Sequence, residues 1–186
     1  MFTEKTFAII DTETLGGAAS AHCPTYHCAG IALTKREEVS RINIVVIGNL
    51  LLDSAFYGKA KKDYYLSLLR DPSTIICFTE EEAKAVFSKW LADNNVTCVC
   101  AHNTSFDFCR TFVRECIEGM EFFDIMFAFF DTKSQTKKYN QCCAENGYYT
   151  ASGNCRMTAE ICYRFVTNDI SFIEEHTALA DSLIEA

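Results

Sequence analysis

Residues 7–14 read Phe-Ala-Ile-Ile-Asp-Thr-Glu-Thr, an apolar run that ends in two carboxylates separated by one residue. The run Phe7–Ile10 is β-branched and aromatic without a helical period, which predicts a buried strand. Side chains two apart on a strand point to the same side, so we expect Asp11 and Glu13 to project together from its end. Like charges held side by side repel unless a cation lies between them, and hard ions such as Mg²⁺ prefer carboxylate oxygen. An ordinary strand ending in a turn is the alternative interpretation.

The composition is typical of a globular chain. A length of 186 residues suits a single domain, 1–186, and 49% hydrophobic with 23% charged residues is ordinary. There is no apolar run of membrane-spanning length and no signal-peptide pattern, so we expect no membrane association and a cytoplasmic location. The cysteines are odd in number, eleven, and several fall in apolar patterns, which favours buried reduced thiols over disulfides.

The formal net charge of −8 argues against a general nucleic-acid coat protein, which is usually basic. It does not argue against an enzyme that handles a short strand beside bound metal ions, because those cations offset several negative charges.

Apolar periodicity predicts a mixed arrangement of strands and helices without internal repeats. The predicted strands are 7–10, 29–33, 42–47, 96–101 and 121–123, with a hairpin turn at 35–38. A capping box at Thr79–Glu82 starts one helix, Ser105 is expected to cap another that ends at Gly119, and Asp124 is expected to cap a third through Phe130. The remaining predicted helices are 64–69, 137–146, 157–168 and 174–185.

Two segments have more than one interpretation. The four residues His22, Cys23, His27 and Cys28 have metal-ligand chemistry, but their spacing matches no zinc-finger pattern, and a hairpin loop explains them equally well. Residues 49–78 include interleaved basic and aromatic side chains that could follow a phosphate backbone and stack on bases. The alternative, which we favour, is a solvated loop that leads into a short helix before Pro72.

Further carboxylates follow later in the chain. Asp107 falls in the first turn of a helix directly after a strand, a position comparable to that of Asp11, although acidic residues also favour helix N-termini in general. His176 and Asp181 lie five residues apart and would diverge by about 140° on a continuous helix. They could converge if His176 lies just before the helix and Asp181 about one turn inside it; an amphipathic terminal helix is the simpler alternative.

Taken together and in this order, Asp-x-Glu at a strand end, Asn-x₃-Asp and His-x₄-Asp resemble the DEDDh family of 3′–5′ exonucleases, over Phe7 to Ser182. The five signature positions are Asp11, Glu13, Asp107, His176 and Asp181. Phe123-Asp124 also resembles the family's final strand and helix cap, and we expect Asp124 to be structural. The sequence departs from the family at Leu15-Gly16, where many members have Thr-Gly, and residues 49–78 match no family motif.

The resemblance implies a ribonuclease-H-like fold, with a mixed five-stranded sheet flanked by helices. It also implies phosphodiester hydrolysis with two divalent ions, Mg²⁺ or Mn²⁺, about 4 Å apart. Asp11 would bridge both ions, Glu13 and Asp181 would hold the ion that binds the attacking water, and Asp107 would serve the second. His176 would be the general base, because neutral imidazole with a pKa of about 6.5 can accept a proton at pH 7. The residues expected near the 3′ nucleotide are Thr14, Leu15, Asn103 and Phe106.

The expected substrates are 3′ ends of single-stranded DNA or RNA. The choice between them depends on contacts to the 2′-hydroxyl from loops that the sequence does not place. A polymerase or a second copy of the chain stays open as a partner. One alternative function is a non-catalytic nucleic-acid-binding or polymerase-associated module on the same fold, and another is a structural zinc protein built on the cysteines. The complete five-residue set favours the enzyme, because a non-catalytic domain need not keep clustered carboxylates.

Overall fold

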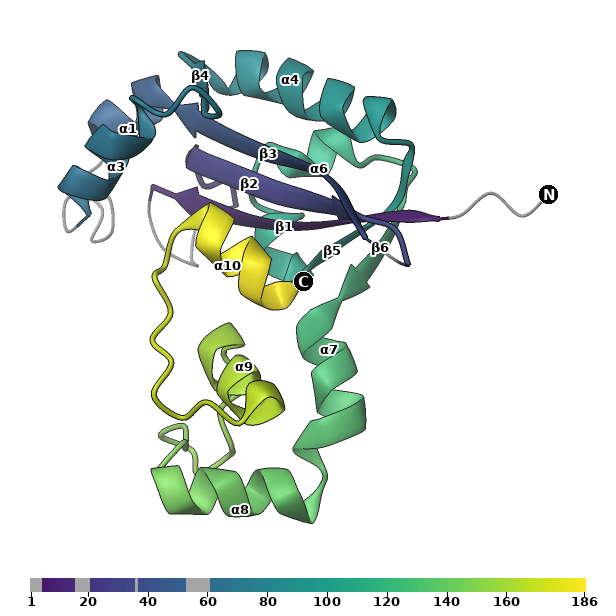
Figure 1. The fold of residues 1–186 in the computed structure, drawn as a ribbon, viewed down its shortest axis with the longest axis vertical. Helices are drawn as coiled ribbons and strands as arrows, with labels where there is room; N and C mark the ends of the chain where they lie inside the picture. The colour runs from purple at the N-terminus through teal and green to yellow at the C-terminus, as the bar shows by residue number, and fades with distance from the viewer. Residues whose placement is uncertain (1–4, 16–20, 36, 53–60) are drawn as a thin grey trace.

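The computed structural model describes residues 5–15, 21–35, 37–52 and 61–186, and it has a mixed α/β fold built on one six-stranded sheet (Figure 1). The strands are β1 (Thr6–Thr14), β2 (Thr25–Leu33), β3 (Glu38–Val46), β4 (Ile75–Cys77), β5 (Val96–Ala101) and β6 (Glu121–Asp124). Their order across the sheet is β4-β3-β2-β1-β5-β6. Strands β1, β2 and β3 are antiparallel neighbours, whereas β5 runs parallel to β1, β6 to β5, and β4 to β3.

All five predicted strands are present, but the prediction of a five-stranded sheet is wrong. The sixth strand, β4, has three residues and lies at the sheet edge, where Ile75 and Ile76 are exposed. So short a segment carries no period-two pattern, and its pairing with β3 depends on a contact distant in sequence. Strand β2 also begins at Thr25, four residues before the predicted start. The hairpin between β2 and β3 agrees with the prediction, although Arg36 lies outside the described residues.

The helical segments are α1 (Ile47–Leu52), α3 (Lys62–Leu68), α4 (Glu80–Asp93), α5 (Thr104–Asp107), α6 (Val113–Cys116), α7 (Ile125–Phe129), the π-helix η1 (Phe130–Ser134), α8 (Lys137–Asn146), α9 (Ala159–Thr167) and α10 (Ala178–Glu185). The capping box is confirmed at α4, where the Thr79 side chain accepts from the Glu82 amide and the Glu82 side chain accepts from the Thr79 amide. None of the helices among the described residues is long and apolar enough to cross a membrane.

The two faces of the sheet carry different helices (Figure 1). Helix α4 covers one face, and Ala8 and Ile10 of β1 join Phe87 of α4 in the largest apolar cluster. Helix α10 lies on the opposite face against β1 and β2. Helices α7, α8 and α9 form a lobe beyond α10, with its own apolar cluster around Phe129 and Tyr139. The side chains of β1 that point to the α10 face are therefore on the side of the sheet that faces this lobe.

Two predicted helices differ from the structure. The helix expected from Ser105 to Gly119 is divided into α5 and α6, and Cys109 between them is exposed. Thr111 Oγ1 donates to the carbonyl of Asp107, a side-chain bond of the kind that competes with a regular helix. Ser105 is not the cap either, because the helix begins at Thr104 and Ser105 Oγ donates to Asn103 Oδ1 at 2.6 Å. The last helix begins at Ala178, not at 174.

Candidate metal centre

Strand β1 supplies the first two carboxylates. Ala8 and Ile10 point toward α4, whereas Ile9 lies in a small cluster with Cys98 and Cys100 on the opposite face. Because side chains alternate along a strand, Asp11 and Glu13 continue the face of Ile9, beneath α10. Their strand is central in the sheet: Asp11 and Glu13 pair with Ala29 and His27 of β2, and the pairing of β1 with β5 ends at Ile9.

Helix α10 supplies the third carboxylate. One oxygen each of Asp11, Glu13 and Asp181 can be chosen so that all three lie within 4.8 Å of one another. Asp181 is only 6% exposed, and among the described residues its Oδ1 has no hydrogen-bond partner. A buried oxygen without a donor is costly, because burial removes its water and nothing replaces it. Three converging carboxylates with such an oxygen match the ligands of a hard divalent cation.

Asp107 lies beside this group without belonging to it. It is 3% exposed, and its Oδ1 accepts a 2.6 Å hydrogen bond from Thr12 Oγ1, between Asp11 and Glu13 in sequence. Its short helix, α5, is held by Asp124, whose Oδ2 accepts from both the amide and the hydroxyl of Thr104 at 2.8 Å. Asp124 also accepts from the Phe127 amide at the start of α7, which confirms the predicted helix cap.

The pKa values of these carboxyl groups are all raised. Burial raises the pKa of Glu13 to about 8, with the charge of Asp181 as the next cause. Burial also raises the pKa values of Asp107 and Asp181 to about 7 each. For Asp11, burial followed by the charge of Asp107 holds the pKa well above its usual range. Without a cation, the group therefore retains protons near neutral pH, and a divalent ion would displace them.

The carboxylates open into a cleft of about 750 Å³. One wall comes from the strand and helix ends that carry Asp11, Glu13, Asp107 and Asp181, and the other from the segment 154–159 that leads into α9. Asn103 and Phe106, two of the residues expected near a 3′ nucleotide, line this cleft. The other two do not line it: Thr14 pairs with Thr25 at the end of β1, and Leu15 packs against the apolar cluster around Tyr26.

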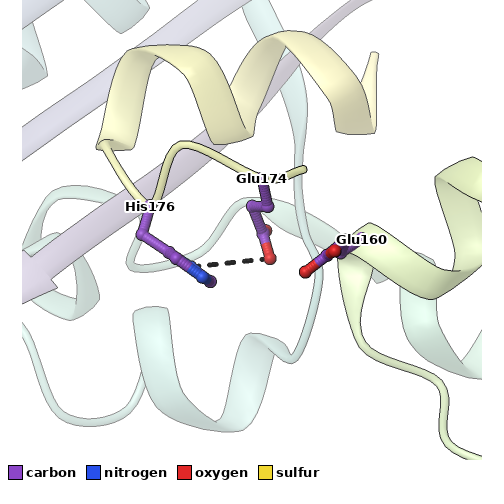
Figure 2. A group of neighbouring side chains, drawn as sticks. All are labelled: Glu160, Glu174 and His176. Atoms are coloured by element: carbon purple, nitrogen blue, oxygen red, sulfur yellow. Dashed lines mark ion pairs between the residues drawn. The ribbon is translucent and has the colours of Figure 1, made fainter. Parts of the chain in front are cut away.

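His176 lies directly before the helix that carries Asp181, as the converging arrangement requires. Its φ of 53° places it in the left-handed region, and Thr177 is the N-cap of α10. The His176 side chain also lines the cleft. Its Nδ1 is 3.5 Å from Glu174 Oε2, and Figure 2 shows Glu160 on the other side of Glu174. A nitrogen of His176 and oxygens of Glu160 and Glu174 form a second group within 4.8 Å.

Three further charged residues act on the site, and none of them is among the site residues predicted from the sequence. Glu185, one helical turn beyond Asp181, has a pKa raised well above its usual range by burial and by Asp107. Glu174 has a pKa raised mainly by burial, and its charge adds to the raised pKa of Asp181. The positive charge of Lys61, at the start of α3, lowers the pKa values of Glu13, Glu174 and Asp181 against these effects. The i, i+4 spacing of Asp181 and Glu185 was the available signal.

The His and Cys residues near 22–28 do not form a group of ligands in the described part of the chain. His27 and Cys28 lie in strand β2, not in the predicted hairpin loop, and neighbours on a strand point to opposite faces. The two ring nitrogens of His27 lie 2.7 Å from Asn43 Oδ1 and 3.3 Å from the Tyr65 hydroxyl. His22 pairs with Glu80, so these side chains have structural partners.

The basic and aromatic stretch is described only in part. Tyr57 and Lys59 lie outside the described residues, while Tyr65 is in the core cluster with Tyr26. Within this stretch, Lys61 is the residue whose positive charge lowers the pKa of the Glu13 carboxyl group.

Comparison with protein-family models gives no match, and comparison with curated proteins gives no significant match. The chemistry of the site is therefore inferred from its own residues.

Proposed function

We propose that the chain is a metal-dependent 3′–5′ exonuclease of the DEDDh type, with a ribonuclease-H-like fold, acting on single-stranded DNA or RNA. The observation that carries the proposal is the convergence of Asp11, Glu13 and the unpartnered, buried oxygen of Asp181. In support of the fold, three antiparallel strands are followed by two parallel ones in the order β3-β2-β1-β5-β6. The five signature residues also line one cleft.

Asp11, Glu13 and Asp181 would hold Mg²⁺ or Mn²⁺, with Asp107 beside them. When bound, the ions would supply charge stabilisation for the phosphate and lower the pKa of water. Asp107 is oriented for this role by Thr12, and the rigid ends of β1 and α10 fix the other three carboxylates. Holding the reacting groups on such elements is what makes catalysis by positioning effective.

His176 would be the general base of the hydrolysis. A ring nitrogen accepts a proton from water while the water oxygen forms a bond to phosphorus, and the bond from phosphorus to the 3′-oxygen breaks. That oxygen takes a proton from solvent, so the products are a nucleoside 5′-monophosphate and a strand shortened by one nucleotide with a free 3′-hydroxyl. Lys61 and the cleft residues Asn103 and Phe106 are suited to the phosphate and the terminal nucleotide.

The direct test is incubation of 5′-labelled single-stranded DNA and RNA with the protein in Mg²⁺, in Mn²⁺ and in chelator. We expect a ladder that shortens from the 3′ end only when a divalent ion is present. A circular single strand serves as the matched control, because it has no end and must stay intact. Absence of shortening with either ion would contradict the proposal and favour a non-catalytic binding module. Tightly held zinc without activity would favour a structural zinc protein.

The same assay tests the expected preference for single strands. A paired and stacked 3′ end must be opened before its terminal phosphate can enter a cleft lined on both walls. The net charge of −8 adds no general attraction for the backbone of a duplex. We therefore expect faster degradation of a single strand than of a blunt duplex at matched salt, and equal rates would contradict this expectation.

A further inference from the structure

We propose that Glu174 is a positioning residue, whose carboxylate accepts the Nδ1–H of His176 and so leaves Nε2 available to take the proton from water. This inference rests on the proposed function, in which His176 is the base. It assigns a role to a carboxylate that belongs to none of the five signature positions.

The two side chains come from the short irregular segment between α9 and α10, in which Glu174 and His176 are two residues apart. The Glu174 carboxylate lies 3.5 Å from the imidazole Nδ1, and Figure 2 shows both side chains directed toward each other. The Glu174 side chain is only 10% exposed, whereas that of His176 is 41% exposed. Both residues line the cleft, and the carboxylate is the more sheltered of the two groups.

The neighbouring carboxylate, Glu160, has a different partner. It forms an ion pair with Arg164 one turn further along α9. Arg164 is fixed in turn, because its guanidinium donates to the Phe172 carbonyl at 2.7 Å and to the Tyr148 hydroxyl at 3.2 Å. Since Glu160 is bound to this anchored arginine, Glu174 is the carboxylate that contacts the imidazole. Because the carboxylates of Glu160 and Glu174 repel each other, a His176 nitrogen that carries a proton is further favoured beside Glu174.

The backbone at His176 has an uncommon conformation. Its φ of 53° lies in the left-handed region, which few non-glycine residues adopt, although histidine is among those enriched there. The next residue, Thr177, is fully buried and begins α10. Backbone held in such a region is found where the surrounding structure determines it, often at functional sites.

The chemical consequence concerns the tautomer of the ring. Neutral imidazole carries one N–H, and the nitrogen that carries it is determined by the partner of that nitrogen. A carboxylate at Nδ1 holds the proton there, so that Nε2 presents its lone pair. Once Nε2 has accepted a proton, the same carboxylate stabilises the positive ring, which is the general logic of a base oriented by a third group.

The test compares Glu174→Ala and Glu174→Gln with the matched control Glu175→Ala, which removes an exposed carboxylate from the adjacent position. We expect Glu174→Ala to lower kcat by about 10- to 100-fold, as for other residues that orient a reacting group, with KM unchanged. Glu174→Gln keeps an acceptor and loses the charge, so its kcat should be intermediate. Glu175→Ala should match the wild type. Thermal melts show whether each variant is folded.

A second measurement does not require activity. In ¹⁵N NMR of the imidazoles, assigned by the signal that His176→Ala removes, we expect His176 to carry its proton on Nδ1. In Glu174→Ala the His176 ring should shift toward the tautomer that carries its proton on Nε2, and in Glu175→Ala it should keep the wild-type tautomer. An unchanged tautomer in Glu174→Ala would overturn the inference. So would loss of Mn²⁺ affinity in calorimetry, since Glu174 would then be a metal ligand. If the wild type degrades no nucleic acid, the proposed function is wrong. The NMR measurement still shows in that case whether Glu174 contacts Nδ1 of His176.

Discussion

At the scale of single residues, Asp11 shows why a buried cluster of carboxylates is energetically unfavourable without a cation. Its pKa is held well above the usual range by burial and by Asp107, so ionising it in the folded protein is unfavourable without a cation. A residue retained for stability alone would not be expected in this environment. The cost is explained if folding is completed by an ion that binds the native state only.

Replacement of Asp11 by asparagine removes one charge and keeps the shape. In chelator we expect Asp11→Asn to melt no lower than the wild type, because one repulsive group has been removed. It should lose most of the stabilisation by Mn²⁺, which for the wild type is about 2.7 kcal/mol when free ion is a hundredfold above Kd. Nearly all activity should be lost as well. The measurement is a set of thermal melts in chelator and in Mn²⁺.

The control for this prediction is Asp93→Asn, which alters an exposed carboxylate paired with Lys89. It should keep the full response to Mn²⁺. If Asp11→Asn instead melts well below the wild type in chelator, Asp11 is a structural residue, and the site built around it must be abandoned.

His176 gives the second prediction at this scale. Because it is proposed as a base and not as a ligand, His176→Ala should lower kcat by about 10²–10⁴-fold while calorimetry shows unchanged Mg²⁺ or Mn²⁺ affinity. His22→Ala alters a histidine that pairs with Glu80 and should leave both quantities unchanged. Loss of metal affinity together with activity in His176→Ala would show that the role is wrongly assigned.

At the scale of elements, a signal contained within one segment was sufficient for prediction. The apolar run Phe7–Ile10 and the capping box at Thr79 each specify their element locally, and both are observed. The three residues of β4 depend on pairing with β3, which is distant in sequence, and the break between α5 and α6 depends on a side-chain bond from Thr111 to the Asp107 carbonyl. Propensity and periodicity do not contain that information.

The same distinction applies to the site. Strand alternation was sufficient to predict that Asp11 and Glu13 project to the same side. The convergence of His176 and Asp181 required only that the helix begin between them, as it does. The proximity of Glu160 to Glu174 and His176 could not be predicted in this way. It depends on how the segment after α9 returns toward the sheet, which is a property of the lobe and not of the local sequence.

Helix α4 allows a test that separates stability from activity. Thr79 Oγ1 accepts a 3.3 Å hydrogen bond from the Glu82 amide, and loss of such a cap typically costs about 0.5–2 kcal/mol. Thr79→Ala should therefore lower the free energy of unfolding by this amount in denaturant titrations. Because α4 lies on the sheet face opposite α10, kcat should not change at temperatures where the variant is folded. A fall in kcat of the folded variant would show that the two faces are coupled.

The whole molecule combines groups whose protonation affects stability in opposite directions. Burial lowers the pKa of His27 to about 4, and burial also lowers that of His102. The unfolded chain binds more protons at these histidines than the folded chain does. Their contribution therefore makes the folded state more stable as pH rises, and it is complete above about 6.5, the unperturbed pKa of histidine. The site carboxylates act in the opposite sense, because the folded state retains protons that the unfolded state has lost.

Above pH 6.5, the carboxylates decide the outcome. The pKa values are about 7 for Asp107 and Asp181 and about 8 for Glu13, far above those of unfolded carboxyl groups. In chelator, the free energy of unfolding should therefore fall as pH rises from about 6.5 through 8, until these groups are ionised in both states. Glu13→Gln removes the carboxyl group whose pKa is about 8 and should flatten the fall. With Mn²⁺ the slope should reverse, since binding displaces protons and strengthens as pH rises. Denaturant titrations at several pH values measure both slopes, and a free energy in chelator that rises over this range would show that the carboxylates are not buried together without a cation.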